Sequence, residues 1–280
     1  MKVKIHNPVL WEKYLKSATP LISVLSLILL FVNSSECRLY ILIFFVITLI
    51  FLFLIMWVVA NGKKHLKMNI MGSDVEICQG DIFKCDDEQK VIAFNEFFDT
   101  DVDDYLVMKR SVNGRYISKY FDNNIDILDK IIENYPNSST RITEQNVVRI
   151  SGKRNRYKLG TIIPNGDYLL LAFAKYDDDI GSYLEMDDYL SCLIDFWKQC
   201  NRYSLGKTIV LPLLGSGITR FPGSAQISDQ ELLEMILWTF KVSSIKINPP
   251  HKLKIVLTKN RLKRINLYEV GAHFHKMSLR

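Results

Sequence analysis

The stretch "IVLPLLGSGITRFP", residues 209–222, decides the fold. Its first half, 209–214, is wholly apolar, which is typical of a strand that is covered on both faces of a sheet. The strand then breaks at Gly215-Ser216-Gly217. Glycines let a backbone approach a ligand closely, and consecutive exposed main-chain N–H groups form an anion-binding nest. The stretch therefore predicts a core strand that ends in a phosphate-binding loop.

Short apolar runs elsewhere predict the other strands of the same sheet. They lie at 74–78, 91–94, 168–174 and 253–257. Between them, apolar residues at helical spacing predict helices over 125–135, 187–199 and 228–240. Ser228 and Glu231 have the spacing of a capping box at the start of the last helix. Strands that alternate with helices indicate a mixed α/β sheet with helices on both faces.

The N-terminal part predicts a hairpin of two transmembrane helices. Residues 39–60 carry no charge, and a helix of that length spans about 33 Å, enough to cross a bilayer core. The apolar run before it is shorter and predicts a helix over about 15–32. Alone it would also suit a signal-peptide core, but no small-residue cleavage site follows. We expect residues 1–61 to form the hairpin and residues 62–280 a cytosolic domain.

The distribution of lysines predicts the orientation of this hairpin. Positively charged residues are retained on the cytoplasmic side of a membrane span. The connecting turn holds only Arg38, beside Glu36, whereas lysines flank the outer ends at positions 2, 4, 13, 16, 63, 64 and 67. We therefore expect a multi-pass protein of the cell inner membrane, with both termini in the cytoplasm.

The net charge of +6 and a basic C-terminal segment favour a membrane partner over a nucleic acid. From Lys252 onward there are eight Lys or Arg residues against one Glu. Such a surface suits the anionic lipids of the inner leaflet. Neither a nucleic-acid-binding motif nor interleaved aromatic residues accompany these charges, so no nucleic-acid partner is expected.

Residues of reactive or metal-binding type give no site. The five cysteines form no CxxC pair, which argues against disulfides and structural zinc. The acidic runs 101–104 and 177–179 are expected to be solvated loops, and His273-Phe274-His275 a frayed tail. Ser216 lacks the G-x-S-x-G setting of a nucleophile and is expected to shape the backbone instead. Accordingly, the sequence predicts no catalytic residue and no bound metal.

Several of these pieces together resemble the macro domain family. Macro domains begin with a G-D-I step and then an apolar strand that ends in Asn. Here Gly80-Asp81-Ile82 follows a short strand, and the next strand, 91–95, ends in Asn. The stretch at 209–222 is similar to the macro phosphate loop, and 253–257 matches the last macro strand. The resemblance covers roughly residues 72–260, with an insertion around 99–150. It implies an α/β macro domain behind the two-helix hairpin.

Macro domains bind ADP-ribose and related nucleotides, and the resemblance carries over roles by position. Asp81 would accept a hydrogen bond from the adenine amino group, and Ile82 would support the ring. The distal part of the ligand would lie against Phe94, Asn95, Glu96 and Phe97. The diphosphate would be held by the main chain of Leu214, Gly215, Ser216, Gly217, Ile218, Thr219 and Arg220, with Phe221 near a ribose.

The sequence departs from hydrolytic macro domains at one place. Those enzymes have N-A-A-N followed by a glycine-rich loop, whereas residues 94–99 read "FNEFFD". The departure predicts a ligand-binding protein without turnover. Phe97 and Phe98 would pack either in the core or against a group on the terminal ribose. A membrane-tethered ADP-ribosyl hydrolase and an anchored reader of ADP-ribosylated proteins remain as alternatives.

Two transmembrane helices ahead of a macro domain resemble the membrane effectors of type II Thoeris antiphage systems. That resemblance implies no cofactor, but a nucleotide signal, histidine-ADP-ribose, made by a TIR-domain partner. It further implies that the protein forms a homo-oligomer when the signal binds, contacts membrane lipids and disrupts the inner membrane.

Overall fold

A computed structural model describes residues 3–86, 88–135, 139–203, 206–223, 227–243 and 245–278. The chain forms two compact units. One contains residues 1–66 together with 263–280, and the other contains residues 67–262.

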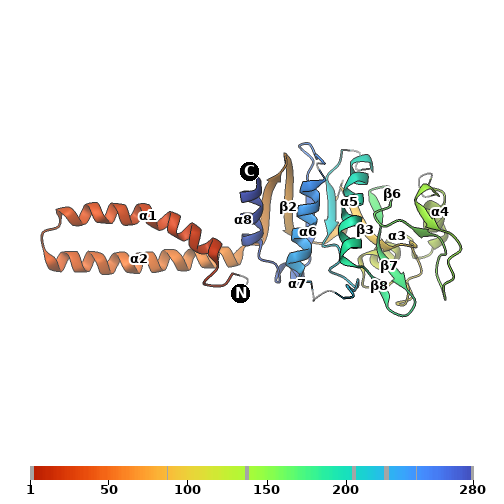
Figure 1. Ribbon diagram of the computed structural model, residues 1–280, viewed down its shortest axis with the longest axis horizontal. Coiled ribbons are helices and arrows are strands. Elements are labelled where there is room, and N and C mark those ends of the chain that lie inside the picture. Colours follow the sequence, from red (N-terminus) through yellow and green to blue (C-terminus); the bar gives the residue numbers. More distant parts are fainter. Residues whose placement is uncertain are drawn as a thin grey trace. The chain divides into compact units, whose positions relative to one another are not determined.

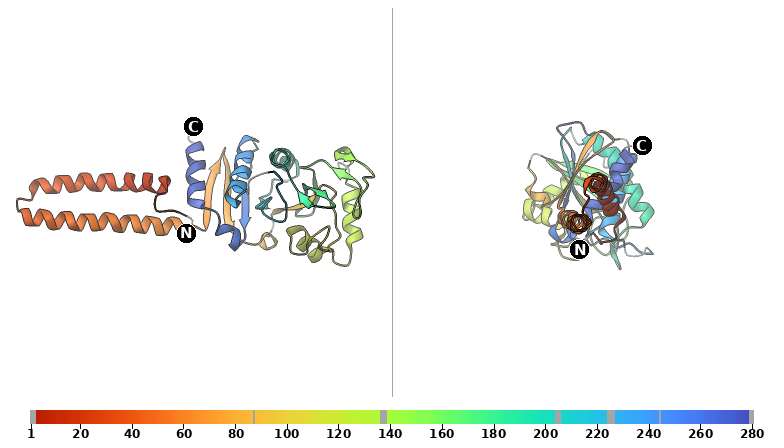
Figure 2. Two further views of the ribbon diagram at one scale, coloured as in Figure 1. Left: turned by 60° about the horizontal axis from the view of Figure 1, so that its bottom comes forward. Right: turned by 90° about the vertical axis from the view of Figure 1, so that its left-hand side faces the viewer.

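The first unit contains a hairpin of two long helices, α1 (Pro8–Phe31) and α2 (Ser35–Gly62), which run side by side (Figure 2). Each has a capped start, because Asn7 accepts hydrogen bonds from the N–H groups of Val9 and Leu10, and Ser34 accepts one from Cys37. These caps explain why both helices begin before the expected positions. Both are long and apolar enough to be candidate membrane spans.

The C-terminal helix α8 (Leu267–Ser278) belongs to the same unit as the hairpin. Its Tyr268 packs against a small buried cluster that includes Val3, Leu10 and Ala60. The indole N–H of Trp57 donates to the carbonyl of Val3 at 2.8 Å. The expectation of a frayed tail around residues 273–275 is wrong, since this segment is helical and the side chain of its central phenylalanine is buried.

The second unit is built on an eight-stranded sheet in the order β1-β2-β10-β9-β3-β7-β6, with β8 paired to β7. The strands are β1 (His65–Ile70), β2 (Ser73–Gln79), β3 (Gln89–Asn95), β6 (Ile162–Asn165), β7 (Tyr168–Asp177), β8 (Gly181–Tyr183), β9 (Ile209–Pro212) and β10 (Leu253–Leu257). From β2 to β7 all neighbours are parallel, while β6 and β8 are antiparallel to β7. The predicted mixed sheet is confirmed.

Helices cover both faces of this sheet. The side chain of Phe173 in β7 contacts Tyr189 of α5 (Met186–Tyr203). Its neighbour Ala172 must point to the opposite face. There it joins the cluster of buried residues that contains Tyr116 of α3 (Val112–Tyr120) and Leu128 of α4 (Ile125–Glu133).

The helices on the first face pack against each other, as Figure 1 shows. The indole N–H of Trp197 in α5 donates to the hydroxyl of Thr239 in α6 (Asp229–Val242) at 3.0 Å. The predicted capping box of Ser228 and Glu231 at the start of α6 is present. Shorter elements are η1 (Ile82–Lys84), η2 (Ser139–Arg141), α7 (Lys259–Leu262) and a two-stranded sheet of β4 (Ile142–Glu144) and β5 (Arg156–Tyr157).

The segment expected as an insertion, residues 99–150, contributes to the hydrophobic core. It contains α3 and α4, whose buried residues Tyr116, Ile117, Leu128 and Ile132 share one cluster with Phe94 of the sheet. One face of the sheet therefore depends on this segment.

Candidate functional site

The expected ligand-binding residues meet at one edge of the sheet. Asp81 follows the end of β2, Glu96 follows the end of β3, and the loop 213–221 follows the end of β9. These three strands are parallel members of one sheet, so their carboxyl ends lie at the same edge. In open α/β sheets this edge is where ligands bind.

Around the glycine bend of the loop 213–221, the carbonyl groups of Leu213, Leu214 and Ser216 are held by the protein. The carbonyl of Leu213 accepts from the N–H of Ser216 at 3.2 Å and from its hydroxyl at 2.7 Å. The carbonyl of Leu214 accepts from the hydroxyl of Tyr189 at 3.2 Å. The carbonyl of Ser216 accepts from Nη2 of Arg261. The hydroxyl of Ser216 thus has the backbone-shaping role predicted for it.

These contacts determine the direction of the loop's N–H groups. In a trans peptide the N–H points opposite to the C=O, so the N–H groups of Leu214, Gly215 and Gly217 point away from the groups that hold the carbonyls. Within the part of the chain that the structure describes, the N–H groups of Gly215, Gly217, Ile218 and Thr219 have no protein acceptor. Gly217 and Ile218 are exposed, so the loop offers several free donors to an anion.

Arg220 and Phe221 have other contacts. The N–H of Arg220 donates to the carbonyl of Ser182 at 3.0 Å, so it is already engaged, and the residue is exposed. The ring of Phe221 packs edge-on against Tyr189, with 5.7 Å between the ring centroids. Gly215 has φ of +82°, and a Cβ there would lie 3.1 Å from Cζ of Phe221. Phe221 thus supports the loop from beneath.

Arg261 was not predicted from the sequence. It lies on α7, far along the chain from the loop, and its Nη1 donates to Oδ1 of Asp229 at 2.8 Å. Asp229 is nearly buried in the first turn of α6. The guanidinium therefore bridges this helix start and the carbonyl of Ser216.

Asp81 is paired with a residue of α3. Its Oδ2 lies 2.7 Å from Nη2 of Arg115, and its Oδ1 accepts from the N–H of Phe83 at 3.2 Å. Burial tends to raise the pKa of Asp81, but these hydrogen bonds and the charge of Arg115 outweigh it, so the pKa lies below its usual value. Ile82 is buried in the hydrophobic core.

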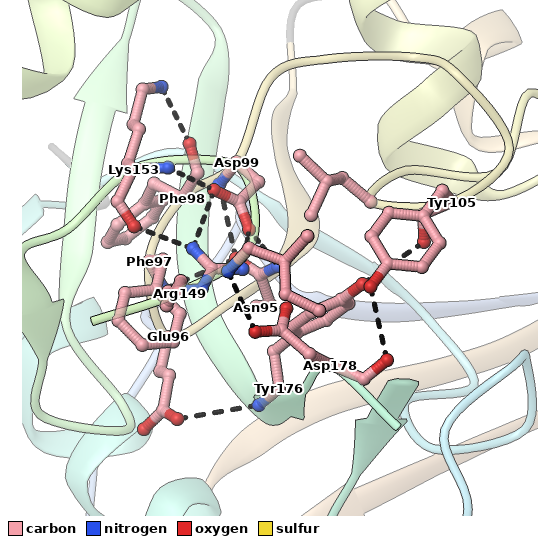
Figure 3. Close-up of polar contacts among 12 residues, drawn as sticks. Asn95, Glu96, Phe97, Phe98, Asp99, Tyr105, Arg149, Lys153, Tyr176 and Asp178 are labelled. Carbon is pink, nitrogen blue, oxygen red and sulfur yellow. Dashed lines mark hydrogen bonds and ion pairs between the residues drawn. The ribbon is translucent and has the colours of Figure 1, made fainter. Parts of the chain in front are cut away.

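The side chain of Asn95 closes the turn that follows β3 (Figure 3). Its Oδ1 accepts from the N–H groups of Phe97 at 3.2 Å and Asp99 at 3.1 Å, and its Nδ2 donates to Oδ2 of Asp99 at 2.8 Å. Phe94 lies in the core cluster, and Phe98 packs against it with 5.8 Å between ring centroids. The contacts of Asn95, Phe94 and Phe98 are therefore with other residues of the protein.

A buried ion pair, which was not predicted from the sequence, stabilises the same turn. Nη1 and Nη2 of Arg149 contact the two carboxylate oxygens of Asp99 at 3.1 and 2.8 Å (Figure 3). Their side chains are only 4% and 0% exposed. Arg149 also stacks on Phe97, 3.8 Å from the ring centroid. Lys153 donates its main-chain N–H to Asp99 at 2.8 Å, and burial lowers the pKa of its ammonium group.

Glu96 is a buried acid beside this turn. Its Oε1 accepts from the N–H of Tyr176 at 3.4 Å and lies 3.5 Å from Nε of Arg156. Burial raises the pKa of Glu96, although the charge of Arg156 opposes the shift.

The acidic runs act as turn caps. Asp103 accepts from the N–H groups of Tyr105 and Leu106 at 2.9 and 2.8 Å. Asp177 accepts from those of Asp179 and Ile180 at 2.9 and 3.2 Å. Each run therefore stabilises its own loop, and Asp178 also accepts from the N–H of Ile150 at 3.0 Å.

The fold is that of a macro domain. The chain superimposes on a point mutant of the Oceanobacillus iheyensis macrodomain with a TM-score of 0.50 and 15% identity, over 77% of this chain and 100% of that one. A second mutant of that macrodomain, described with ADPR, aligns with a TM-score of 0.49 and 15% identity, over 76% of this chain and 99% of that one.

Sequence comparison gives a narrower assignment. Residues 75–258 match the family model described as "Thoeris protein ThsA, Macro domain". The chain is 38% identical over 239 residues to the Thoeris protein ThsA of Bacillus amyloliquefaciens strain Y2, covering 84% of this chain and 80% of that protein. The chain therefore belongs to the Thoeris ThsA macro domain family.

Proposed function

We propose that this protein is a membrane-anchored receptor for an ADP-ribose-type nucleotide in Thoeris antiphage defence. The observation that carries the proposal is the loop 213–221, whose carbonyls are held by Tyr189 and Arg261 while free N–H groups face away from them. A diphosphate suits such a loop, because its charge is met by main-chain dipoles without a basic side chain. Membership of a macro domain family favours ADP-ribose as the parent ligand.

The remaining parts of the nucleotide would lie on either side of the loop. Asp81 would accept from the adenine amino group and would then share its carboxylate with Arg115. The distal ribose would lie toward Glu96 and Phe97.

The turn after β3 favours a protein that binds the nucleotide without hydrolysing it. In hydrolytic macro domains a glycine-rich loop follows the asparagine. Here both functional atoms of the Asn95 amide are used within the turn, and Phe97 is buried beneath Arg149. We therefore propose a sensor, in preference to a hydrolase or a reader of ADP-ribosylated proteins.

The proposed signal is histidine-ADP-ribose, made by a TIR-domain partner. The hairpin α1–α2 would anchor the protein in the inner membrane with both termini in the cytoplasm. A ligand shifts an assembly equilibrium only if it binds the assembled state more tightly. Signal binding would therefore favour a homo-oligomer, gather the hairpins and disrupt the membrane.

Calorimetry on the detergent-solubilised full chain tests the ligand. The panel contains ADP-ribose, its cyclic isomers and the histidine adduct, and the adduct is expected to bind most tightly. Asp81→Ala should abolish binding, whereas Asp86→Ala, an exposed acid nearby, should not. Full affinity in the Asp81 variant would show that the adenine position is wrong, and turnover of the ligand would show that the protein is an enzyme.

Oligomerisation and membrane disruption need a separate measurement. Adding the adduct should increase the oligomer size in light scattering and allow a membrane-impermeant dye into cells that express the protein. Tight binding without dye entry would leave a receptor that does not damage the membrane.

A further inference from the structure

A surface basin with an excess of positive charge is lined in part by Asp81. It is an open depression with a volume of about 450 Å³. Its lining consists of Asp81, Phe83, Lys84, Lys109, Arg115, Ser118 and Lys119. These residues come from η1, from α3 and from the loop before α3, so two separate segments of the chain build it.

The charges of this basin are not balanced within the protein. Four cationic side chains face one carboxylate, and that carboxylate is paired with Arg115. Within the described residues, the ammonium groups of Lys84, Lys109 and Lys119 have no carboxylate partner. Like charges that share a concave surface repel each other, and a bound anion would relieve that repulsion.

The aromatic ring of Phe83 lies close to two of the cations, Arg115 and Lys119. The guanidinium carbon of Arg115 lies 4.7 Å from the ring centroid of Phe83. Nζ of Lys119 lies 5.7 Å from the same centroid and 5.0 Å from that of Tyr120. Cation–π contacts of this kind restrict long side chains that would otherwise spread into solvent. Two donors are thereby already positioned over one side of the basin.

We propose that this basin binds a phosphate group that carries two or more negative charges, such as a diphosphate or a phosphomonoester. The excess of three positive charges among the lining residues matches such a group. Arginine and lysine are the residues that most often bind phosphate. The basin shares Asp81 with the proposed adenine position, but its phosphate-binding cations are its own and it does not use the loop 213–221, so the proposal does not rest on the proposed function.

Inorganic pyrophosphate is the probe, titrated by calorimetry into the full chain in phosphatidylcholine nanodiscs. We expect the double variant Lys109→Glu/Lys119→Glu to lose one binding site, with affinity there reduced at least about tenfold, or about 1.4 kcal/mol. Lys130→Glu, an exposed charge reversal on α4, is the matched control and should bind as the parent does. Circular dichroism of each variant checks folding, and both lysines of the double variant are exposed.

Two results would overturn the proposal: no pyrophosphate binding by the parent chain, or equal stoichiometry and affinity in the parent and the double variant. ADP-ribose titrated into the same proteins tests the proposed function separately, so failure of one can be told from failure of the other. Repeating the titration in discs that contain phosphatidic acid, whose headgroup is a phosphomonoester, identifies the source of the phosphate. A lower apparent affinity in the parent alone indicates a lipid headgroup, and an unchanged affinity indicates a soluble ligand.

Discussion

Arg261 determines the direction of the peptide group after Ser216. Its Nη2 donates to the carbonyl of Ser216, and its Nη1 is held at 2.8 Å by Asp229. Because peptide groups are planar, fixing this carbonyl also fixes the N–H of Gly217 on the opposite side. The geometry of the loop 213–221 thus depends on a side chain from α7.

Arg261→Ala should weaken binding of ADP-ribose about tenfold or more, an effect of roughly 1.4 kcal/mol. The reason is the loss of a positioned N–H donor, since Arg261 itself lies behind the loop. Calorimetry measures the effect. Lys259→Ala, an exposed residue of the same helix, is the control. Equal affinities for the two variants would show that the loop keeps its shape without the arginine.

Gly215→Ala should impair both folding and binding. Its φ of +82° disfavours a Cβ, and that atom would lie 3.1 Å from Phe221 and 3.3 Å from Leu232 and Tyr189. We expect a loss of about 1–2 kcal/mol in the free energy of unfolding, measured by thermal unfolding. Gly217→Ala should be nearly neutral for stability, because no atom lies within 4 Å of the added Cβ. A Gly215 variant as stable as the Gly217 variant would contradict the loop conformation.

Asp99→Ala should be strongly destabilising. It leaves the guanidinium of Arg149 buried without its carboxylate, which costs about 3–5 kcal/mol in comparable sites. The matched control is Asp167→Ala. That aspartate pairs with Lys207 on the surface, with side chains 47% and 41% exposed, so its loss should cost less than about 1 kcal/mol. Similar melting temperatures for the two variants would exclude a structural role for the buried pair.

Glu96→Gln tests the raised pKa of Glu96. A raised pKa means that the folded protein favours the neutral acid, so this contribution to stability is full below the usual pKa of 4.5 and is lost as the pH rises through the shifted value. Glutamine stays neutral at every pH. The melting temperature of the variant relative to the parent should therefore increase as the pH rises from about 4.5 to 8. A constant or falling difference would contradict the shift.

The sequence predicted the central sheet because its signals are local. Apolar runs correspond to β2, β3, β7, β9 and β10, and the glycine bend after β9 lies where it was expected. Three outer strands, β1, β6 and β8, were missed. Of these, β6 and β8 are short and are formed by pairing with β7. Helix α3 was missed because its sequence is largely polar and contains Gly114. That glycine is required by packing, since a Cβ would lie 2.2 Å from the carbonyl oxygen of Met108.

The residues that shape the candidate site were harder to predict than the loop itself. Arg261, Arg149 and Arg115 each contact a partner far away in the sequence, at Ser216, Asp99 and Asp81 respectively. No motif or spacing links such pairs. The Asn95 side chain was expected beside the ligand, but the turn uses its hydrogen-bonding atoms.

The contacts of Asp99 with Arg149 and Lys153 also close a ring in the chain. The ring contains α3 and α4, which pack on one face of the sheet. Extending a closed loop costs little, about 0.6 kcal/mol per doubling of its length. Insertions into the connecting loops of this ring should therefore cost little, provided that the buried residues of α3 and α4 that pack on the sheet are kept.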